Sequence, residues 1–190
     1  DIKAFHAAIA AVKEDIRGLT RRLQQDLPSG ELALFDAYIL MLDSASLTDK
    51  VVQRIEAGNW AQGALRETIM EHLRAFDNIE DNYLRERADD VRDLGRRILM
   101  YLQTSTPTTR EYYPRTILVG EEVTAGQLAE VPVQCFAGVV SARGSGSSHV
   151  AILAKALGVP AVMGVEGLPA GRLEGQELIV DGYQGQVYVK

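Results

Sequence analysis

Residues 144–158 read Gly-Ser-Gly-Ser-Ser-His-Val-Ala-Ile-Leu-Ala-Lys-Ala-Leu-Gly. Small and hydroxyl-bearing residues fill the first part of this stretch, and glycine there favours a tight turn. In the second part Val150, Leu153 and Leu157 recur at steps of three and four, which is the spacing of one helix face. The stretch therefore predicts a Gly-rich turn that leads directly into a helix over residues 149–157.

Short apolar runs on both sides of this stretch predict β-strands. They cover residues 116–119, 136–140, 161–163, 178–180 and 186–189. The second run leads into the Gly-rich turn, and Gly182-Tyr183-Gln184-Gly185 predicts the turn of a hairpin between the last two. We therefore expect residues 116–190 to form a small α/β domain.

The first half of the chain has helical periodicity throughout. Helices are predicted over about 2–23, 29–42 and 46–57, followed by one long helical pattern to Leu102 that is bent near Asp77-Asn78. Asn59 and Gln62 have the spacing of a capping box at the start of this last pattern. Residues 1–103 are thus expected to form a helical hairpin or bundle, and the polar residues 104–115 a linker.

Composition excludes several classes of protein. The 190 residues carry a net charge of −6 with an isoelectric point near 5.1, which argues against a nucleic-acid binder. A single cysteine, Cys135, excludes a disulfide framework, and neither His6 nor His72 has a second ligand at metal-binding spacing. No apolar run is long enough to span a membrane. Because the sequence starts at Asp1, inside a helical pattern, we expect it to be a piece cut from a longer protein. A cytoplasmic location is also expected.

The Gly-rich turn carries the candidate chemistry. Backbone amides of Gly144 and Gly146, with the hydroxyls of Ser147 and Ser148, could surround an anion at a positive helix end. His149 then falls in the first helical turn, where a neutral imidazole is a nucleophile. The same pattern also fits a helix capped by one of the two serines, with an ordinary polar histidine behind it.

Residues 144–164 resemble the phosphohistidine signature of the phosphoenolpyruvate-utilising enzymes, which include enzyme I of the phosphotransferase system, pyruvate phosphate dikinase and phosphoenolpyruvate synthase. The matching residues are Ser148, His149, Lys155, the run Leu157-Gly158-Val159-Pro160-Ala161-Val162 and Gly164. Residues 83–99 resemble the long helix of enzyme I, which the other two lack. Residues 144–146 and 178–185 resemble the nitrogen-related type of enzyme I.

This resemblance implies that the α/β domain is a swivelling phosphohistidine domain. His149 would be the catalytic residue: it would accept a phosphoryl group from phosphoenolpyruvate, bound to a C-terminal domain absent from this sequence, and pass it to an HPr-like carrier. Gly144, Gly146, Ser147 and Ser148 would bind the phosphate. No cofactor is implied for this region, whereas the full-length enzyme would use Mg²⁺ and form a homodimer.

The resemblance also implies that the carrier docks on the helical part, with Tyr38, Met41 and Asp43 as contact residues. The dense charge run over residues 85–97 is expected to be a solvated helix face with a scaffolding role. Leu128 stands where the family often has a threonine that contacts the histidine.

Two alternatives remain open at this stage. The chain could be the phosphohistidine domain of a dikinase or synthase, although residues 85–99 argue against this. It could also be a non-catalytic module that only docks a carrier, and an acid-labile phosphate on His149 would separate this alternative from a phosphotransferase.

Overall fold

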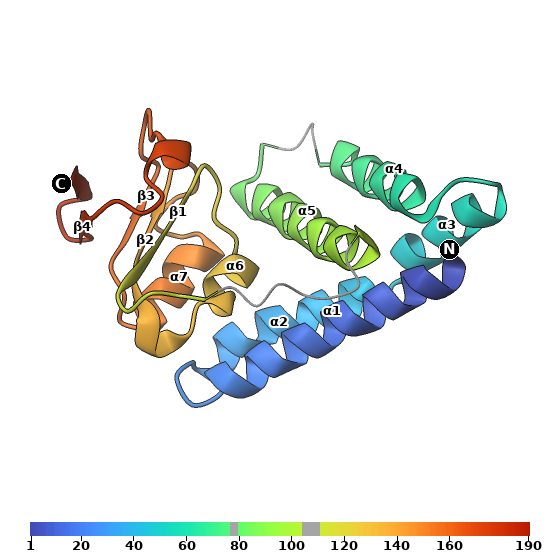
Figure 1. Ribbon diagram of the computed structural model, residues 1–190, viewed down its shortest axis with the longest axis horizontal. Coiled ribbons are helices and arrows are strands. Elements are labelled where there is room, and N and C mark those ends of the chain that lie inside the picture. The colour runs from blue at the N-terminus through green and yellow to red at the C-terminus, as the bar shows by residue number, and fades with distance from the viewer. Residues whose placement is uncertain (77–79, 104–110) are drawn as a thin grey trace. The chain divides into compact units, whose positions relative to one another are not determined.

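The computed structural model describes residues 1–76, 80–103 and 111–190. The chain divides into two compact units (Figure 1). The helical unit comprises Asp1–Gln24 and Leu32–Thr109, and the α/β unit comprises Gln25–Glu31 and Arg110–Lys190. Residues 104–110 of the predicted linker lie outside the described residues. A helical bundle followed by a small α/β region is the predicted fold class, which is thereby confirmed.

The helices of the first unit follow the apolar periodicity of the sequence. They are α1 (Ile2–Leu23), α2 (Ser29–Leu42), α3 (Ala45–Glu56), α4 (Ala61–Arg74) and α5 (Asn82–Gln103). In α1 the buried residues form one stripe: Phe5, Ala8, Ile9, Val12, Ile16, Leu19 and Leu23. Helix α5 packs between α1 and α4, and α3 packs against α4 (Figure 1). This packing supplies most of the stability of such helices.

The structure corrects two details of the helical prediction. The long pattern after residue 60 is two helices, α4 and α5, and residues 77–79 between them lie outside the described part. The predicted capping box is also wrong, because Trp60 is the N-cap of α4 and makes no side-chain cap. Asn59 instead donates to Glu67 at 3.1 Å, and Gln62 donates to the carbonyl of Leu102 at 3.4 Å.

A three-stranded parallel sheet organises the α/β unit. Its order is β1 (Thr116–Gly120), β2 (Phe136–Ser141) and β3 (Ala161–Met163), with β2 in the centre. Parallel strands need crossover connections, which are made here by α6 (Ala125–Glu130) and α7 (His149–Ala156). Val139 and Val140 of β2 are fully buried. The carboxyl ends of the three strands therefore meet at one edge of the sheet.

A two-stranded antiparallel hairpin, β4 (Leu178–Asp181) and β5 (Gln186–Val189), completes the unit. Its turn is held by the Asp181 carboxylate, which accepts the amides of Tyr183 and Gln184 at 2.9 and 3.0 Å. The hairpin packs on the larger sheet: a Cβ added to Gly138 would lie 3.4 Å from the Val180 side chain. None of the described helices is both long and apolar enough to cross a bilayer.

Candidate active site

The loop that carries the candidate chemistry lies at the carboxyl edge of the parallel sheet, between the end of β2 and the start of α7. Backbone hydrogen bonds fix its beginning to both neighbouring strands. The amide of Ala142 donates to Gly120 at 3.1 Å, and the amide of Arg143 donates to Glu121 at 2.9 Å. On the other side, the amide of Val165 donates to the carbonyl of Ser141 at 3.1 Å.

Ser141, which no sequence motif singled out, strengthens this attachment through its side chain. The residue is 1% exposed. Its hydroxyl accepts the amide of Val123 at 3.3 Å and donates to the carbonyl of Glu121 at 3.4 Å. Buried hydroxyls in proteins are normally hydrogen-bonded. A serine at the end of an apolar strand is therefore a sequence signal for a hydrogen bond to a neighbouring segment.

Gly144 has a conformation that few other residues adopt. Its φ is +94°, and a Cβ placed on it would lie 2.9 Å from the Met163 methyl carbon. Gly146 is different, since a Cβ there would meet nothing within 4 Å. The structure therefore gives a steric reason for the first glycine and none for the second.

The serines of the loop have distinct positions. Ser148 is the N-cap of α7: its Oγ accepts the amide of Ala151 at 3.2 Å, and the residue is 5% exposed. Ser147 is exposed, and its hydroxyl lies 2.9 Å from that of Ser145. Of the two serines expected as possible caps, Ser148 is therefore the cap, and Ser147 is the one with an accessible hydroxyl.

His149 is the first residue of α7, as the sequence predicts. Its side chain is half-buried, and the Nδ1 atom is buried. The amides of the first helical turn and the positive end of the helix dipole lie at this point, which favours a negatively charged group. The geometry therefore combines a nucleophilic side chain with an environment that suits a phosphoryl group.

Leu128 is a core residue of α6, which packs against α7. It is 1% exposed and offers no hydroxyl to the site. The nearest threonine in sequence, Thr124, is the N-cap of α6, where its Oγ1 accepts the amide of Gln127 at 3.2 Å. Thr124 thus forms a capping box and already has a structural task.

The residues expected to contact a carrier have unlike surroundings in α2 and the turn after it. Tyr38 is 3% exposed, and its hydroxyl donates to Asp90 Oδ1 at 2.7 Å. It is therefore a core residue rather than a surface contact. Met41 is half-buried, whereas the neighbouring Leu40, which the sequence analysis did not single out, is 71% exposed.

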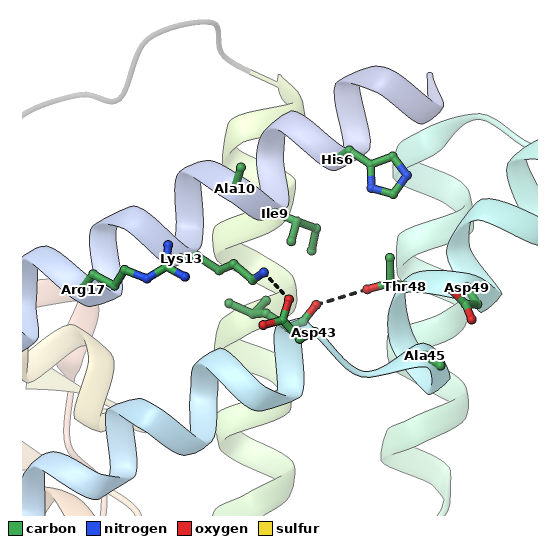
Figure 2. Close-up of a pocket in the computed structure, with 10 residues that line it drawn as sticks. His6, Ile9, Ala10, Lys13, Arg17, Asp43, Ala45, Thr48 and Asp49 are labelled. Atoms are coloured by element: carbon green, nitrogen blue, oxygen red, sulfur yellow. Dashed lines mark hydrogen bonds and ion pairs between the residues drawn. The ribbon is translucent and has the colours of Figure 1, made fainter.

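Asp43 borders a pocket of about 410 Å³ between α1 and the α2–α3 turn (Figure 2). Its carboxylate pairs with the Lys13 ammonium, and the hydroxyl of Thr48 donates to the carbonyl of Leu42 at 3.1 Å. The residues that line the pocket are His6, Ile9, Ala10, Lys13, Arg17, Leu42, Asp43, Ala45, Thr48 and Asp49. Charges of both signs therefore surround it.

The charge run on α5 is only partly a solvated face. Arg92 pairs with Asp89 at 2.7 Å in the expected exposed manner. Asp90 and Asp93, however, are 4% and 5% exposed, and Arg97 Nε donates to Asp93 Oδ2 at 3.0 Å. Burial raises the pKa of the Asp90 carboxyl to about 6, and burial beside that carboxyl raises the pKa of Tyr38 far above its ordinary value.

Within the described part of the chain, no three His, Cys, Asp or Glu residues could hold a metal ion together.

Comparison with known proteins agrees with this architecture. Residues 1–87 match the family model described as "PEP-utilising enzyme, N-terminal", and residues 112–185 match "PEP-utilising enzyme, mobile domain". A solved structure of the "N-terminal domain of Enzyme 1 - Nitrogen" is 32% identical with a TM-score of 0.67, over all of this chain and 77% of that one. The chain belongs to the phosphoenolpyruvate-utilising enzymes. Within that family it corresponds to the N-terminal domain of enzyme I of the phosphotransferase system.

The curated relatives are longer than this chain. A "Phosphoenolpyruvate-dependent phosphotransferase system" protein of Salmonella typhimurium is 36% identical over 96% of this chain and 24% of its own length. The "Phosphoenolpyruvate-protein phosphotransferase" of Geobacillus stearothermophilus is 30% identical over all of this chain and 33% of its own length. The chain thus spans about a quarter to a third of these relatives.

Proposed function

We propose that this chain is the phosphoryl-carrying region of a phosphoenolpyruvate-protein phosphotransferase, with His149 as the phosphorylated residue. His149 would accept a phosphoryl group from phosphoenolpyruvate bound elsewhere in the full-length protein and pass it to an HPr-like carrier. The observation that carries the proposal is the position of His149. It begins α7 immediately behind a Gly-rich loop, at the carboxyl edge of the parallel sheet.

The proposed reaction consists of two displacements at phosphorus. First the lone pair of the imidazole bonds to phosphorus, while the bond from phosphorus to the bridging oxygen of phosphoenolpyruvate breaks and pyruvate leaves as its enolate. Then a carrier imidazole bonds to phosphorus, and the nitrogen–phosphorus bond to His149 breaks. Because Nδ1 of His149 is buried, we assign Nε2 as the acceptor. Each step needs near in-line geometry.

The chain's own groups would stabilise the phosphoryl oxygens. The exposed Ser147 hydroxyl and the amides of Gly144 and Gly146 are suited to hydrogen bonding with them, and the dipole of α7 adds about 0.3–1 kcal/mol. Ser148 contributes indirectly, because it caps the helix that presents His149. Its buried hydroxyl makes it a positioning residue rather than the phosphate ligand that the sequence suggested.

The alternation of His149 between two partners requires movement of the α/β unit. The division of the chain into two compact units supports such a swivel, since interfaces between domains commonly allow relative motion. We propose that hinges flanking residues 104–115 allow this movement. For the full-length enzyme we likewise propose a Mg²⁺ requirement and a homodimer. We propose a cytoplasmic location for this chain and for the full-length enzyme.

We further propose the nitrogen-related type of enzyme I and a role in nitrogen regulation. Two observations support this assignment. The similar solved structure is described as the nitrogen form, and the Gly144-Ser145-Gly146 sequence resembles that type. Relatives named as phosphotransferases across the whole chain favour enzyme I over a dikinase.

Phosphorylation in vitro tests the assignment of His149. The chain is incubated with a ³²P-phosphorylated HPr-like carrier, and the label is located by mass spectrometry under non-acidic conditions. We expect His149→Ala to fold normally and accept no phosphate. His72→Ala serves as the matched control and should retain labelling, because His72 lies in α4 and does not line the pocket beside Asp43. Label in the His149 variant would refute the proposal, and an unlabelled wild-type chain that still binds the carrier would indicate a docking module.

A further inference from the structure

We propose that Arg143 binds the phosphoryl group on His149 and neutralises part of its charge. The inference rests on the proposed function and deepens it, because it assigns a cation to a phosphate site otherwise built from glycines and serines. It is carried by the charges of this segment, the path of the loop and the exposure of the Arg143 side chain.

The segment around His149 contains few charged residues. Between positions 131 and 165, the only Asp, Glu, Lys or Arg residues are Arg143 and Lys155. Lys155 lies in the last turn of α7, six residues after His149, which places it about 9 Å further along the helix axis. Arg143 is therefore the full positive charge that this segment offers on the loop side of the histidine.

The path of the loop brings Arg143 next to the first turn of α7. Arg143 directly precedes Gly144, and a Cβ placed on Gly144 would lie 3.8 Å from Ser148 Oγ. The amide of Ser148 donates to the carbonyl of Ser145 at 3.0 Å, which closes the turn between them. Arg143 and His149 thus flank the point where the two ends of the loop meet. Consecutive Cα atoms are about 3.8 Å apart, so the long arginine side chain can reach a group on the histidine.

The Arg143 side chain is accessible to an anion. The amide of Arg143 donates to the carbonyl of Glu121 at 2.9 Å, which holds the backbone, whereas the residue itself is exposed. Among the described residues, neither the Arg143 guanidinium nor the carboxylate of the adjacent Glu121 takes part in an ion pair. The sheet therefore fixes where the arginine begins and leaves its charged end accessible.

The helix dipole alone does not balance the charge of a phosphoryl group. A phosphorylated side chain carries a charge of about −1.5 to −2 at pH 7, whereas the N-terminal end of a helix is equivalent to about +0.5. A guanidinium presents its N–H donors in a planar fork that matches two phosphoryl oxygens at once. Arg143 stays protonated and forms no covalent bond, so it stabilises phospho-His149 through charge-assisted hydrogen bonds.

The equilibrium of phosphoryl transfer between the HPr-like carrier and the 190-residue chain tests the inference. The ³²P-labelled carrier is mixed with the chain at concentrations below the Kd of their complex, and the label on each protein is measured at equilibrium. Weaker docking slows this exchange but leaves its equilibrium constant unchanged, because both sides contain only free proteins. A contact with the phosphoryl group on His149 changes the constant itself.

Arg143→Gln should shift this equilibrium about fivefold or more towards the phosphorylated carrier, because charge-assisted hydrogen bonds are lost. Arg143→Lys keeps the charge without the fork and should shift the equilibrium less. Arg172→Gln is the matched control, because it removes an exposed arginine of the same α/β unit from outside the loop. We expect no shift from the control. A shift in Arg143→Gln no larger than that in the control would overturn the inference alone.

NMR spectra detect the contact directly. Phosphorylation of the wild-type chain should move the ¹³C-detected Nε and Cζ signals of Arg143 and leave those of Arg172 in place. Unmoved Arg143 signals in a chain phosphorylated on His149 would also overturn the inference. A wild-type chain that accepts no phosphate from the carrier would overturn the proposed function, and this inference with it.

Discussion

At the scale of single residues, the loop before His149 depends on a few positions with unlike tasks. Gly144 has a positive φ and lies against Met163, whereas Gly146 has open space around it. Ser148 caps α7, and Ser147 leaves its hydroxyl accessible. Residues that look equivalent in the sequence therefore divide into those that shape the loop and those that could touch a phosphoryl group.

Replacing Gly144 by alanine should destabilise the α/β unit by about 1–3 kcal/mol, because a side chain is strained at this φ and would crowd Met163. Urea unfolding measures the effect. Gly146→Ala is the control and should change the free energy of unfolding by less than about 0.5 kcal/mol. Equal losses in both variants would contradict the steric interpretation.

Asp90 should make the stability of the helical unit depend on pH. Burial raises its pKa from 3.8 to about 6 in the folded state, so the folded chain binds this proton more tightly than the unfolded chain. Its stabilising contribution is complete below the unfolded pKa of about 4 and is lost as pH rises through 6.

Thermal unfolding from pH 4 to 7.5 tests this linkage. Asp90→Asn removes the titration and keeps an acceptor for the Tyr38 hydroxyl. We expect the variant to lose this pH dependence and to be more stable than wild type at pH 7.5, by up to roughly 3 kcal/mol. Asp89→Asn, on the same helix but paired with Arg92, is the control. An unchanged pH profile in the Asp90 variant would contradict the assignment.

At the scale of elements, α7 is a short helix whose first turn carries His149. It has eight residues, and the Ser148 hydroxyl satisfies one of its free amides. Its inner face, formed by Val150, Leu153 and Ala154, is buried. Short helices are marginal by themselves, so the cap and this packing together determine whether the histidine is held in place.

The two serines before His149 should therefore respond differently to mutation. Ser148→Ala removes the cap and should cost about 1 kcal/mol of stability. Ser147→Ala should leave the free energy of unfolding unchanged and slow phosphoryl transfer from the carrier. Denaturant unfolding and single-turnover phosphorylation measure the two effects. The reverse pattern would show that the serines have been assigned to the wrong tasks.

Much of the element structure could be predicted from the sequence, and the exceptions have physical causes. Helix α1 and all five strands follow apolar periodicity and lie where it places them. The separation of α4 from α5 was missed because helical spacing continues through that region. The buried Asp90 and Asp93 were expected on a solvated face, since burial of a charged side chain depends on packing partners distant in sequence.

The position of the candidate loop could also be predicted from the sequence, whereas the catalytic role of His149 stays a prediction. His149 and the loop before it carry local signals that a reader of the sequence can recognise. Ser141 and Leu40 do not, because their roles depend on the ends of neighbouring strands and on which face of an apolar helix is covered. Tyr38, which was expected to contact a carrier, is buried, and its burial also depends on which helix face is covered.

At the scale of the whole molecule, the chain contains the proposed carrier site and resembles one region of its phosphotransferase relatives. It spans about a quarter to a third of its curated relatives. We expect phosphoenolpyruvate with Mg²⁺ to leave the isolated chain unlabelled, whereas the phosphorylated carrier labels it. Autoradiography of the chain after incubation with either ³²P-labelled phosphoryl donor checks both reactions. Labelling from phosphoenolpyruvate alone, in a preparation free of host enzyme I, would contradict this expectation.

The hydrogen bonds at the carboxyl edge of the sheet also determine how much of the structure must unfold before the loop does. The amides of Ala142, Arg143 and Val165 join the loop region to both neighbours of β2. Breaking them locally would expose the ends of all three strands at once. Solvent exchange of these amides should therefore require the same sub-global unfolding event that releases the amides of β2. The candidate loop should therefore stay ordered for as long as the parallel sheet itself stays folded.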